Sequence, residues 1–352
     1  MQQPSNTNAP FINSLKQAEV RWLANAIFAP PLLQMRSLPD SNTQTIARAP
    51  NFKHKDHLQA AVFILDTNYR QWLQTLDNNP QPLLAFLRSE RRLKLGILHE
   101  RLWQFFLGNQ SSTQLLATNL KAKQGRRDIG EFDIVYQHQD HGLIHLEVAS
   151  KYYLASTAAT DQWQVWLGPG KTDRLDLKLD HSINKQINLA DCSGVKEQLI
   201  TKLYSVEDSA ATDTRQYPFT LGKQLHIGGR LFYRYSLIRV TEAINAASDL
   251  FERRLAPSHL NDQHLCGHWL FAAEWQQLKS RLVSDYQWLE KSQWLDTSEH
   301  NLKRDSQTPA SIQADDIEHT QTPRLLVYST HRQQKYFCFI VPDNWEENAF
   351  QN

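Results

Sequence analysis

Two stretches of the chain alternate apolar and polar residues with a period of two, one over residues 130–136 and one over residues 143–151. This pattern predicts two strands, and the polar run at residues 138–142 predicts a hairpin turn between them. The apolar residues would share one face: Phe132, Ile134, Ile144, Leu146 and Val148. The other face would carry Glu131, Asp133, His145, Glu147 and Lys151. A turn centred on Asp140 would place Asp133 directly opposite Glu147.

Helices and strands alternate along the rest of the chain. Apolar residues three and four positions apart predict helices over residues 15–27, 56–76, 83–107 and 173–189, and residues 241–295 have a similar helix-like pattern. Further strands are predicted at residues 113–121, 224–227, 230–237, 325–328 and 336–341, the last two as a second hairpin. The order helix, three strands, helix, strand across residues 83–238 predicts an α/β fold.

We expect four parts along the chain. They are a disordered tail at residues 1–11, a helical part at residues 12–82, an α/β core at residues 83–240 and an α+β extension at residues 241–352. Within the extension, residues 296–322 lack aromatic side chains and are rich in Ser, Thr, Gln, Asp and Glu, which predicts a mobile insertion.

The composition of the chain limits its cellular compartment and the kinds of partner that it can bind. The 352 residues include 38 Lys and Arg against 37 Asp and Glu, so a surface that binds nucleic acid must be local. The chain has no apolar signal core near its start and no apolar run approaching the roughly 18 residues of a membrane span. Three widely spaced cysteines, Cys192, Cys266 and Cys338, do not form a disulfide framework. We therefore expect a cytoplasmic protein.

The paired carboxylates are the main candidate site. Two carboxylates facing each other across a strand pair destabilise a sheet, which favours a role in holding a cation. Mg²⁺ or Mn²⁺ prefers such oxygen ligands, so Asp133 and Glu147 are predicted metal ligands, with Glu131 one pleat away. Lys151 would hold the attacking water or offset the charge that develops on the phosphorane. The alternative is a solvated sheet face on which each carboxylate pairs with a nearby Lys or Arg.

These residues resemble a known superfamily. An acidic residue on one strand, a glutamate and a lysine on the next, and a preceding helix with its own glutamate resemble the PD-(D/E)XK nucleases. The run Gly-Glu-Phe-Asp at residues 130–133, followed by Leu-Ile-His-Leu-Glu-Val at residues 143–148, is especially similar. Segments 146–154, 166–171, 184–186 and 339–345 further resemble a bacterial family, domain of unknown function 1853. The resemblance implies a nuclease-like core between a helical N-terminal part and an α+β C-terminal extension.

One position departs from the superfamily pattern. The lysine normally follows the glutamate by two residues, where this chain has Ala149. Lys151 lies roughly 7 Å further along the same strand face. Lys171 or Lys178 is an alternative source of the positive charge. A site that binds metal or nucleic acid without cutting is a third possibility.

Other charged residues add to the candidate site. Glu100, in the apolar helix before the hairpin, is either the helix-borne acid of the superfamily or the partner of Arg101 or another base. Predicted nucleic-acid contacts are Lys171, Arg174, Lys178 and Lys185; the last three, with His181, share one helix face, and the alternative is a solvated face. Lys121, Lys123, Arg126 and Arg127 form a loop cluster open to the same two interpretations.

The leading functional prediction is a Mg²⁺-dependent hydrolase that cleaves nucleic acid, DNA in preference to RNA. Its catalytic residues would be Asp133, Glu147, Lys151, Glu131 and Glu100. The alternative is a catalytically inactive nuclease-like fold that binds nucleic acid or a protein partner. A third hypothesis, a nucleotide-binding module using Lys171, rests on an incomplete phosphate-binding loop that has Val165 where a glycine is required.

Overall fold

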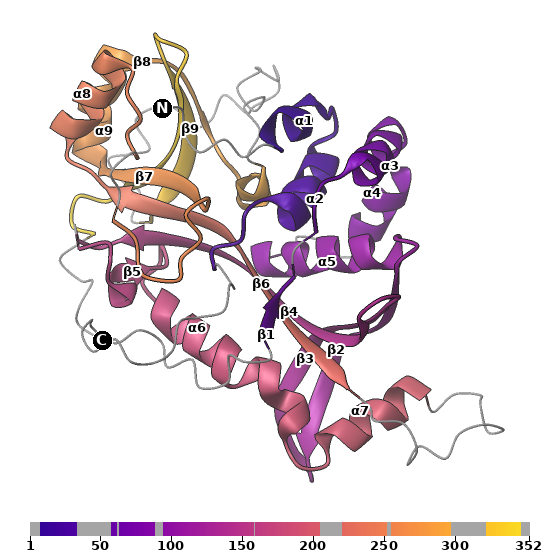
Figure 1. Cartoon of the computed structure of the whole chain (residues 1–352). Coiled ribbons are helices and arrows are strands. Elements are labelled where there is room, and N and C mark those ends of the chain that lie inside the picture. The colour runs from indigo at the N-terminus through magenta and orange to yellow at the C-terminus, as the bar shows by residue number, and fades with distance from the viewer. Residues whose placement is uncertain are drawn as a thin grey trace.

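A mixed sheet runs through the computed structural model of the chain (Figure 1). The structure describes residues 8–33, 58–61, 63–88, 94–157, 159–204, 220–251, 255–296 and 322–345. In these ranges the sheet has ten strands, eight of them in the order β2-β3-β4-β6-β7-β10-β9-β8, while β1 pairs with β6 and β5 with β4. The predicted α/β class is thereby confirmed.

The bounds of the elements are as follows. The strands are β1 (Leu58–Ala60), β2 (Thr113–Gln124), β3 (Arg127–His138), β4 (Gly142–Ala155), β5 (Trp166–Leu167), β6 (Leu221–Arg234), β7 (Leu265–Phe271), β8 (Val283–Trp288), β9 (Arg324–Thr330) and β10 (Lys335–Val341). The α-helices are α1 (Ala9–Ser14), α2 (Ala18–Phe28), α3 (Thr67–Asn78), α4 (Gln81–Arg88), α5 (Leu95–Gly108), α6 (Leu175–Asn184), α7 (Val195–Tyr204), α8 (Leu237–Ala246) and α9 (Ala272–Leu282). Short 3₁₀ turns are η2 (Trp163–Val165), η3 (Gln186–Asp191) and η4 (Lys291–Leu295).

The predicted order helix, three strands, helix, strand is present as α5, β2, β3, β4, α6 and β6. Strands β2, β3 and β4 are antiparallel neighbours, and β4 lies parallel to β6 over twelve register positions from Leu143 to Leu154. A parallel pair needs a long crossover. Here α6, η3 and α7 provide it.

Apolar clusters on the two sides of β4 show which helices cover which face. Ile144, Leu146 and Val148 pack in one cluster with the N-terminal helices α2 to α5. On the opposite face, Leu143 packs with η3 and α7, while Tyr153 packs with α6, α8 and α9. Protein therefore covers both faces of β4, and the polar residues His145 and Glu147 point into protein rather than into water.

Several predicted elements are wrong in type or extent. The predicted helix at residues 56–76 begins with β1, and α3 starts only at Thr67. The helix predicted at residues 83–107 is divided between α4 and α5, and residues 89–93 lie outside the described ranges. The predicted helix-like region at residues 241–295 contains β7 and β8 as well as α9. Short apolar runs that fit both periods account for these differences.

The predicted strand pair at residues 224–237 is the single strand β6. Gly229, in its middle, has φ +125°, and a Cβ there would lie 1.8 Å from the Lys151 carbonyl oxygen. Gly229 therefore permits close approach to β4, and the two glycines at 228 and 229 do not form a turn. The predicted hairpin near the end of the chain is confirmed as the antiparallel pair β9–β10.

The predicted division of the chain into four parts stays a prediction. Residues 9–11 of the predicted tail begin α1, whereas residues 1–7 and the bulk of the predicted insertion, residues 297–321, lie outside the described ranges. The predicted boundary near residue 240 stays a prediction, although the sheet continues across it through the parallel pair β6–β7. Among the described helices, none has the length and apolar character that crossing a membrane requires.

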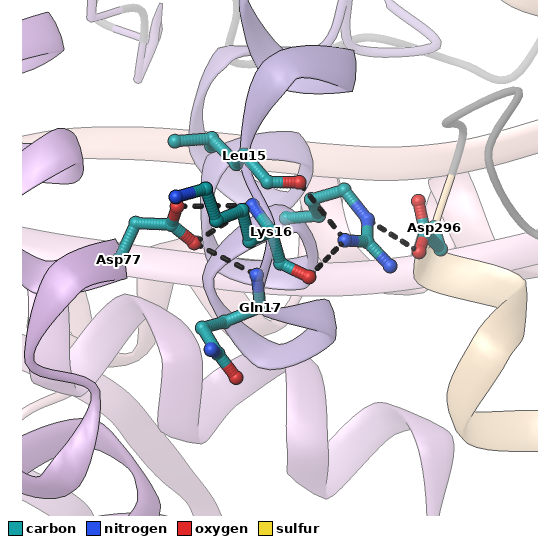
Figure 2. Close-up of polar contacts among 6 residues, drawn as sticks. Leu15, Lys16, Gln17, Asp77 and Asp296 are labelled. Carbon is teal, nitrogen blue, oxygen red and sulfur yellow. Dashed lines mark hydrogen bonds and ion pairs between the residues drawn. The ribbon is translucent and has the colours of Figure 1, made fainter.

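A buried polar junction joins the N-terminal helices to η4 (Figure 2). The carboxylate of Asp77 accepts backbone N–H groups of Lys16 at 2.9 and 3.0 Å and of Gln17 at 2.8 Å, at the start of α2. Arg21 donates to the carbonyls of Leu15 and Lys16, and its Nε lies 3.0 Å from Asp296 Oδ2. Side-chain exposure is 9% for Arg21 and 1% for Asp296, so this ion pair is buried.

Candidate active site

The candidate site lies where β3 separates from β4. The β3–β4 ladder runs from the turn to the pair Ile134–Leu146. Beyond this pair, β3 continues beside β2 as a two-stranded ribbon, and β4 continues beside β6. Asp133 and Glu147 are the next residues on the two strands, and the backbone N–H of Val148 donates to Asp133 Oδ2 at 3.2 Å. The hairpin register predicted from sequence therefore does bring the two carboxyl groups together.

The β3 strand is irregular at this point. Phe132 packs with Val135 on the η3 side, whereas Ile134 packs with the N-terminal helices, so Phe132 and Ile134 do not share the face predicted for them. The opposing residue on β2, Asn119, has a left-handed backbone with φ +50°. The two-residue alternation is interrupted here, and groups from both faces of the sheet converge near Asp133.

A buried histidine, His145, is within hydrogen-bonding distance of Glu147. His145 is fully buried and Glu147 is 2% exposed, and His145 Nε2 lies 2.8 Å from Glu147 Oε1. The His145 ring packs edge-on against Phe132 with 4.7 Å between ring centroids. Burial lowers the pKa of His145 to about 4, so its imidazole is neutral at neutral pH.

The carboxyl groups share an electrostatic environment that opposes ionisation. Burial, followed by the negative charge of Glu147, raises the pKa of Asp133 to about 7. Burial likewise raises the pKa of Glu147 to about 7, against the opposing effects of Asp133 as a hydrogen-bond partner and of Lys178. Adjacent buried carboxyl groups of this kind retain a proton between them near neutral pH.

Glu100 of α5 belongs to the same electrostatic group. Burial, followed by the charge of Asp133, raises the pKa of Glu100 to about 7, and a hydrogen bond from Asn119 opposes this effect. Asn119 Nδ2 also donates to Glu131 Oε1 at 3.1 Å. The helix-borne acid and the strand acids are therefore brought together, with Glu131 at their edge. Asn119 had no sequence signal, because its role depends on its left-handed backbone, whereas His145 already shared the predicted polar face.

The three candidate lysines, Lys178, Lys151 and Lys171, have different partners in the structure. Lys178 of α6 is the lysine whose charge opposes the raised pKa of both Glu100 and Glu147, and its Nζ donates to Gln186 Oε1 at 3.2 Å. Lys151 forms an ion pair with Asp173 at 2.5 Å. Lys171 lies over the Trp345 ring at 5.2 Å from its centroid. Ala149 occupies the usual lysine position, and three other lysines could supply the positive charge. Of these three, Lys178 is the one whose charge acts on the carboxyl groups of Glu100 and Glu147.

The predicted basic stripe is shorter than expected. Arg174 and Lys185 flank α6 as its terminal caps, and Arg174 pairs with Asp176 through contacts of 2.7 and 2.9 Å. Lys185 is exposed. Lys178 is therefore the predicted nucleic-acid contact that lies inside the helix and near the carboxyl groups.

The donor set fits a hard divalent cation in its chemistry. Asp133 and Glu147 supply adjacent carboxylate oxygens, and a cation between them would offset the burial that raises both pKa values and the effect of the Glu147 charge on Asp133. In the described part of the chain, however, no three His, Cys, Asp or Glu side chains are already arranged to hold a metal ion. Asp133 and Glu147 would therefore hold it as a pair, with Glu100 adding charge to the site.

Fold and site define a mixed α/β protein with a cluster of carboxyl groups where two strands separate. The profile of the family described as Domain of unknown function (DUF1853) matches residues 21–338, most of the chain, and the chain belongs to this family. Neither the curated proteins nor the solved structures contain a match to the chain.

Proposed function

We propose that this chain is a Mg²⁺-dependent nuclease that hydrolyses phosphodiester bonds of nucleic acid, DNA in preference to RNA. The observation that carries the proposal is the meeting of Asp133 and Glu147 at the strand separation, with Glu100 and Lys178 in the same electrostatic group. Buried titratable groups that perturb one another's pKa values concentrate at functional sites.

The arrangement of elements supports the same proposal. The order α5, β2, β3, β4, α6, β6, with β4 parallel to β6, is the order expected of a PD-(D/E)XK nuclease-like core. The acidic residues occupy the second strand, the third strand and the preceding helix, as that resemblance implies. Fold resemblance alone does not establish activity, so the carboxyl groups carry the argument.

Each residue of the site has a role in this reaction. A bound Mg²⁺ would polarise the phosphodiester and lower the pKa of an attacking water. Asp133 and Glu147 would hold that ion, and His145 would keep the Glu147 carboxylate in place. Glu100, with a pKa near 7, would accept the proton of the water. Lys178, in place of Lys151, would stabilise the charge that develops on the phosphate oxygens. Glu131 would act on the site through Asn119, which donates a hydrogen bond to it and also to Glu100.

A catalytically inactive fold that binds nucleic acid or a protein partner is the second candidate. Ala149 at the usual lysine position favours it, as does the ion pair that Lys151 makes with Asp173. The two candidates differ in whether a bound nucleic acid is cleaved.

Calorimetric titration with Mg²⁺ and Mn²⁺ tests the proposal. The parent protein should bind either ion, and Asp133→Asn and Glu147→Gln should each weaken binding at least about tenfold, because each removes one carboxylate ligand. Asp128→Asn serves as the matched control, since Asp128 is an exposed carboxylate at the β2–β3 turn. Absence of binding in the parent, or equal weakening by the control, would overturn the metal site.

Cleavage assays with linear and circular DNA and with RNA then separate the two candidates. Cleavage that depends on Mg²⁺ and is lost in Asp133→Asn is the expected result. Lys178→Met should lower the rate by at least about 100-fold, and Lys151→Met should lower it far less. Metal binding without cleavage of any of these substrates would replace the nuclease by the inactive fold.

A further inference from the structure

A local basic surface lies at the turn that joins β2 to β3. It comprises five positively charged residues, called here the basic hairpin: Lys121, Lys123, Arg126, Arg127 and, from α7, Lys202. The side chains of Lys121 and Lys123 are 63% and 50% exposed, and Arg126, Arg127 and Lys202 are exposed as well. This concentration contrasts with the whole chain, whose net charge is +1.

Helix α7 fixes the hairpin in place. Lys202 Nζ donates to the Lys121 carbonyl at 3.3 Å, and Gln198 Nε2 donates to the Lys123 carbonyl at 2.7 Å. Apolar residues Val195 and Leu199 of the same helix are buried against the ribbon. Figure 1 shows α7 beside β2 and β3 at the foot of the view. The positive charges are therefore presented on a supported ribbon.

Few acidic groups neutralise this surface. Asp128 is shared between Lys121 and Lys123, with Nζ–Oδ distances of 3.7 Å to each, and its side chain is 54% exposed. Exposed ion pairs of this length contribute little and exchange readily for other anions. Glu131, opposite Lys121 in the register, is a second carboxylate beside the hairpin. These two carboxylates face five positively charged side chains, so the basic hairpin keeps a net positive charge.

The basic hairpin and Asp133 of the carboxyl site lie on the same ribbon of β2 and β3. Lys121 pairs with Glu131, two residues from Asp133, and Arg127 begins the same strand. At about 3.3 Å per residue, the tip lies roughly 20 Å from Asp133 along β3. With a rise of about 3.4 Å per nucleotide, this distance corresponds to about six nucleotides.

We propose that the basic hairpin is the docking surface for the phosphate backbone of a nucleic acid, which extends about six nucleotides from the bond that is cut. The position of the cut rests on the proposed function, whereas docking on the hairpin does not. An anionic membrane is the less favoured partner, because the large apolar residues exposed in the described ranges, Ile64, Ile97, Leu177, Ile238 and Leu255, lie outside the hairpin.

Fluorescence anisotropy without divalent cations tests the docking surface separately from the metal site. The probes are labelled DNA duplexes, one shorter than about six base pairs and one several times longer. The test variant is Arg126→Glu combined with Arg127→Glu. The matched control is Lys291→Glu combined with Arg332→Glu, which makes the same charge change at exposed residues of the C-terminal part.

The hairpin variant should bind the longer duplex at least about tenfold more weakly and reduce the slope of log affinity against log salt by about two, while the control stays near the parent. The shorter duplex should bind weakly to all three proteins. Equal losses in both variants, or no loss in the hairpin variant, would overturn the proposal. Loss of binding to vesicles containing phosphatidylserine, with unchanged DNA binding, would assign the surface to a membrane instead.

The two proposals fail in different ways. Docking on the hairpin together with absent Mg²⁺ binding would overturn the nuclease and leave the docking surface standing. Mg²⁺ binding together with hairpin-independent DNA affinity would overturn the docking surface alone.

Discussion

Asp133 and Glu147 lie side by side in a part of the sheet that water reaches poorly, so the ionised forms of both repel each other. A carboxyl group whose pKa is raised by folding stabilises the protein below its ordinary pKa, and this contribution is lost as the pH rises through the folded value. For these groups the window runs from about pH 4 to about pH 7. Above this window, the pair destabilises the metal-free protein.

The substitution Asp133→Asn should therefore stabilise the metal-free protein at pH 8. The amide removes one negative charge and keeps the size of the side chain, so the expected gain in the free energy of unfolding is about 2 kcal/mol at pH 8. At pH 4, where the native carboxyl group is protonated, the gain should nearly vanish. Urea unfolding at the two pH values, followed by tryptophan fluorescence, measures the difference.

Asp128→Asn is the control for Asp133→Asn, because Asp128 is exposed and its ion pairs with Lys121 and Lys123 are long. It should change stability by less than about 0.5 kcal/mol at either pH. A gain in Asp133→Asn that is the same at pH 4 and pH 8 would mean that the buried ionised carboxylate is not its cause.

At the residue scale, the sequence predicted the pairing of Asp133 with Glu147 because a short hairpin turn and two alternating strands define the register. It did not predict Asn119 or the position of Lys178. Asn119 takes its role from a left-handed backbone at an irregular point of β2, and Lys178 reaches the site through the packing of α6 on the sheet. Local patterns contain neither kind of information.

At the scale of elements, strand β6 positions the site by lying beside β4 through the residues that carry Glu147 and Lys151. The sequence favoured a turn at its two central glycines, because glycine is common in turns. In the structure the absence of a side chain at Gly229 instead permits the backbone of β6 to approach Lys151. Helix and strand were similarly confused at residues 56–76 and 241–295, where burial by distant elements outweighs local preference.

The substitution Gly229→Ala should disrupt the pairing of β6 with β4. A Cβ at this position would lie 1.8 Å from the Lys151 carbonyl oxygen, and φ +125° is unfavourable for alanine. Because a backbone atom blocks the side chain, the expected loss in the free energy of unfolding exceeds about 3 kcal/mol. Urea unfolding and the yield of folded protein after purification measure it.

Gly96→Ala provides the opposite expectation for the same change of residue. Gly96 lies in α5, and a Cβ there would meet nothing within 4 Å. Alanine is the better helix former, so a gain of about 0.5 to 1 kcal/mol is expected. A Gly229→Ala protein as stable as the parent would show that β6 does not approach β4 as closely as described.

At the scale of the whole molecule, the sheet passes from the candidate site into the C-terminal part, and the N-terminal helices are attached to that part by a separate contact. Arg21 of α2 and Asp296, directly after η4, form this contact although 275 positions separate them (Figure 2). Sequence patterns gave no indication of it, since neither residue belongs to a motif. Tertiary packing alone brings the two charges together.

Removing one partner of this buried pair should destabilise the protein unequally. Asp296→Ala leaves Arg21 with the carbonyls of Leu15 and Lys16 as acceptors, whereas Arg21→Ala leaves a buried carboxylate without its guanidinium. We expect a loss of about 3 to 5 kcal/mol for Arg21→Ala and a smaller loss for Asp296→Ala. Urea unfolding of both variants and of the double variant gives the coupling energy between the two residues.

The exposed pair Lys121–Asp128 is the comparison for the coupling between Arg21 and Asp296, because its atoms lie 3.7 Å apart and both side chains are more than half exposed. Its coupling energy should stay below about 1 kcal/mol. If the buried pair coupled no more strongly than this exposed one, Arg21 and Asp296 would not hold the N-terminal helices against the C-terminal part. The restoration of stability in the double variant, relative to Arg21→Ala alone, is the result that ties the effect to the buried carboxylate that has lost its guanidinium.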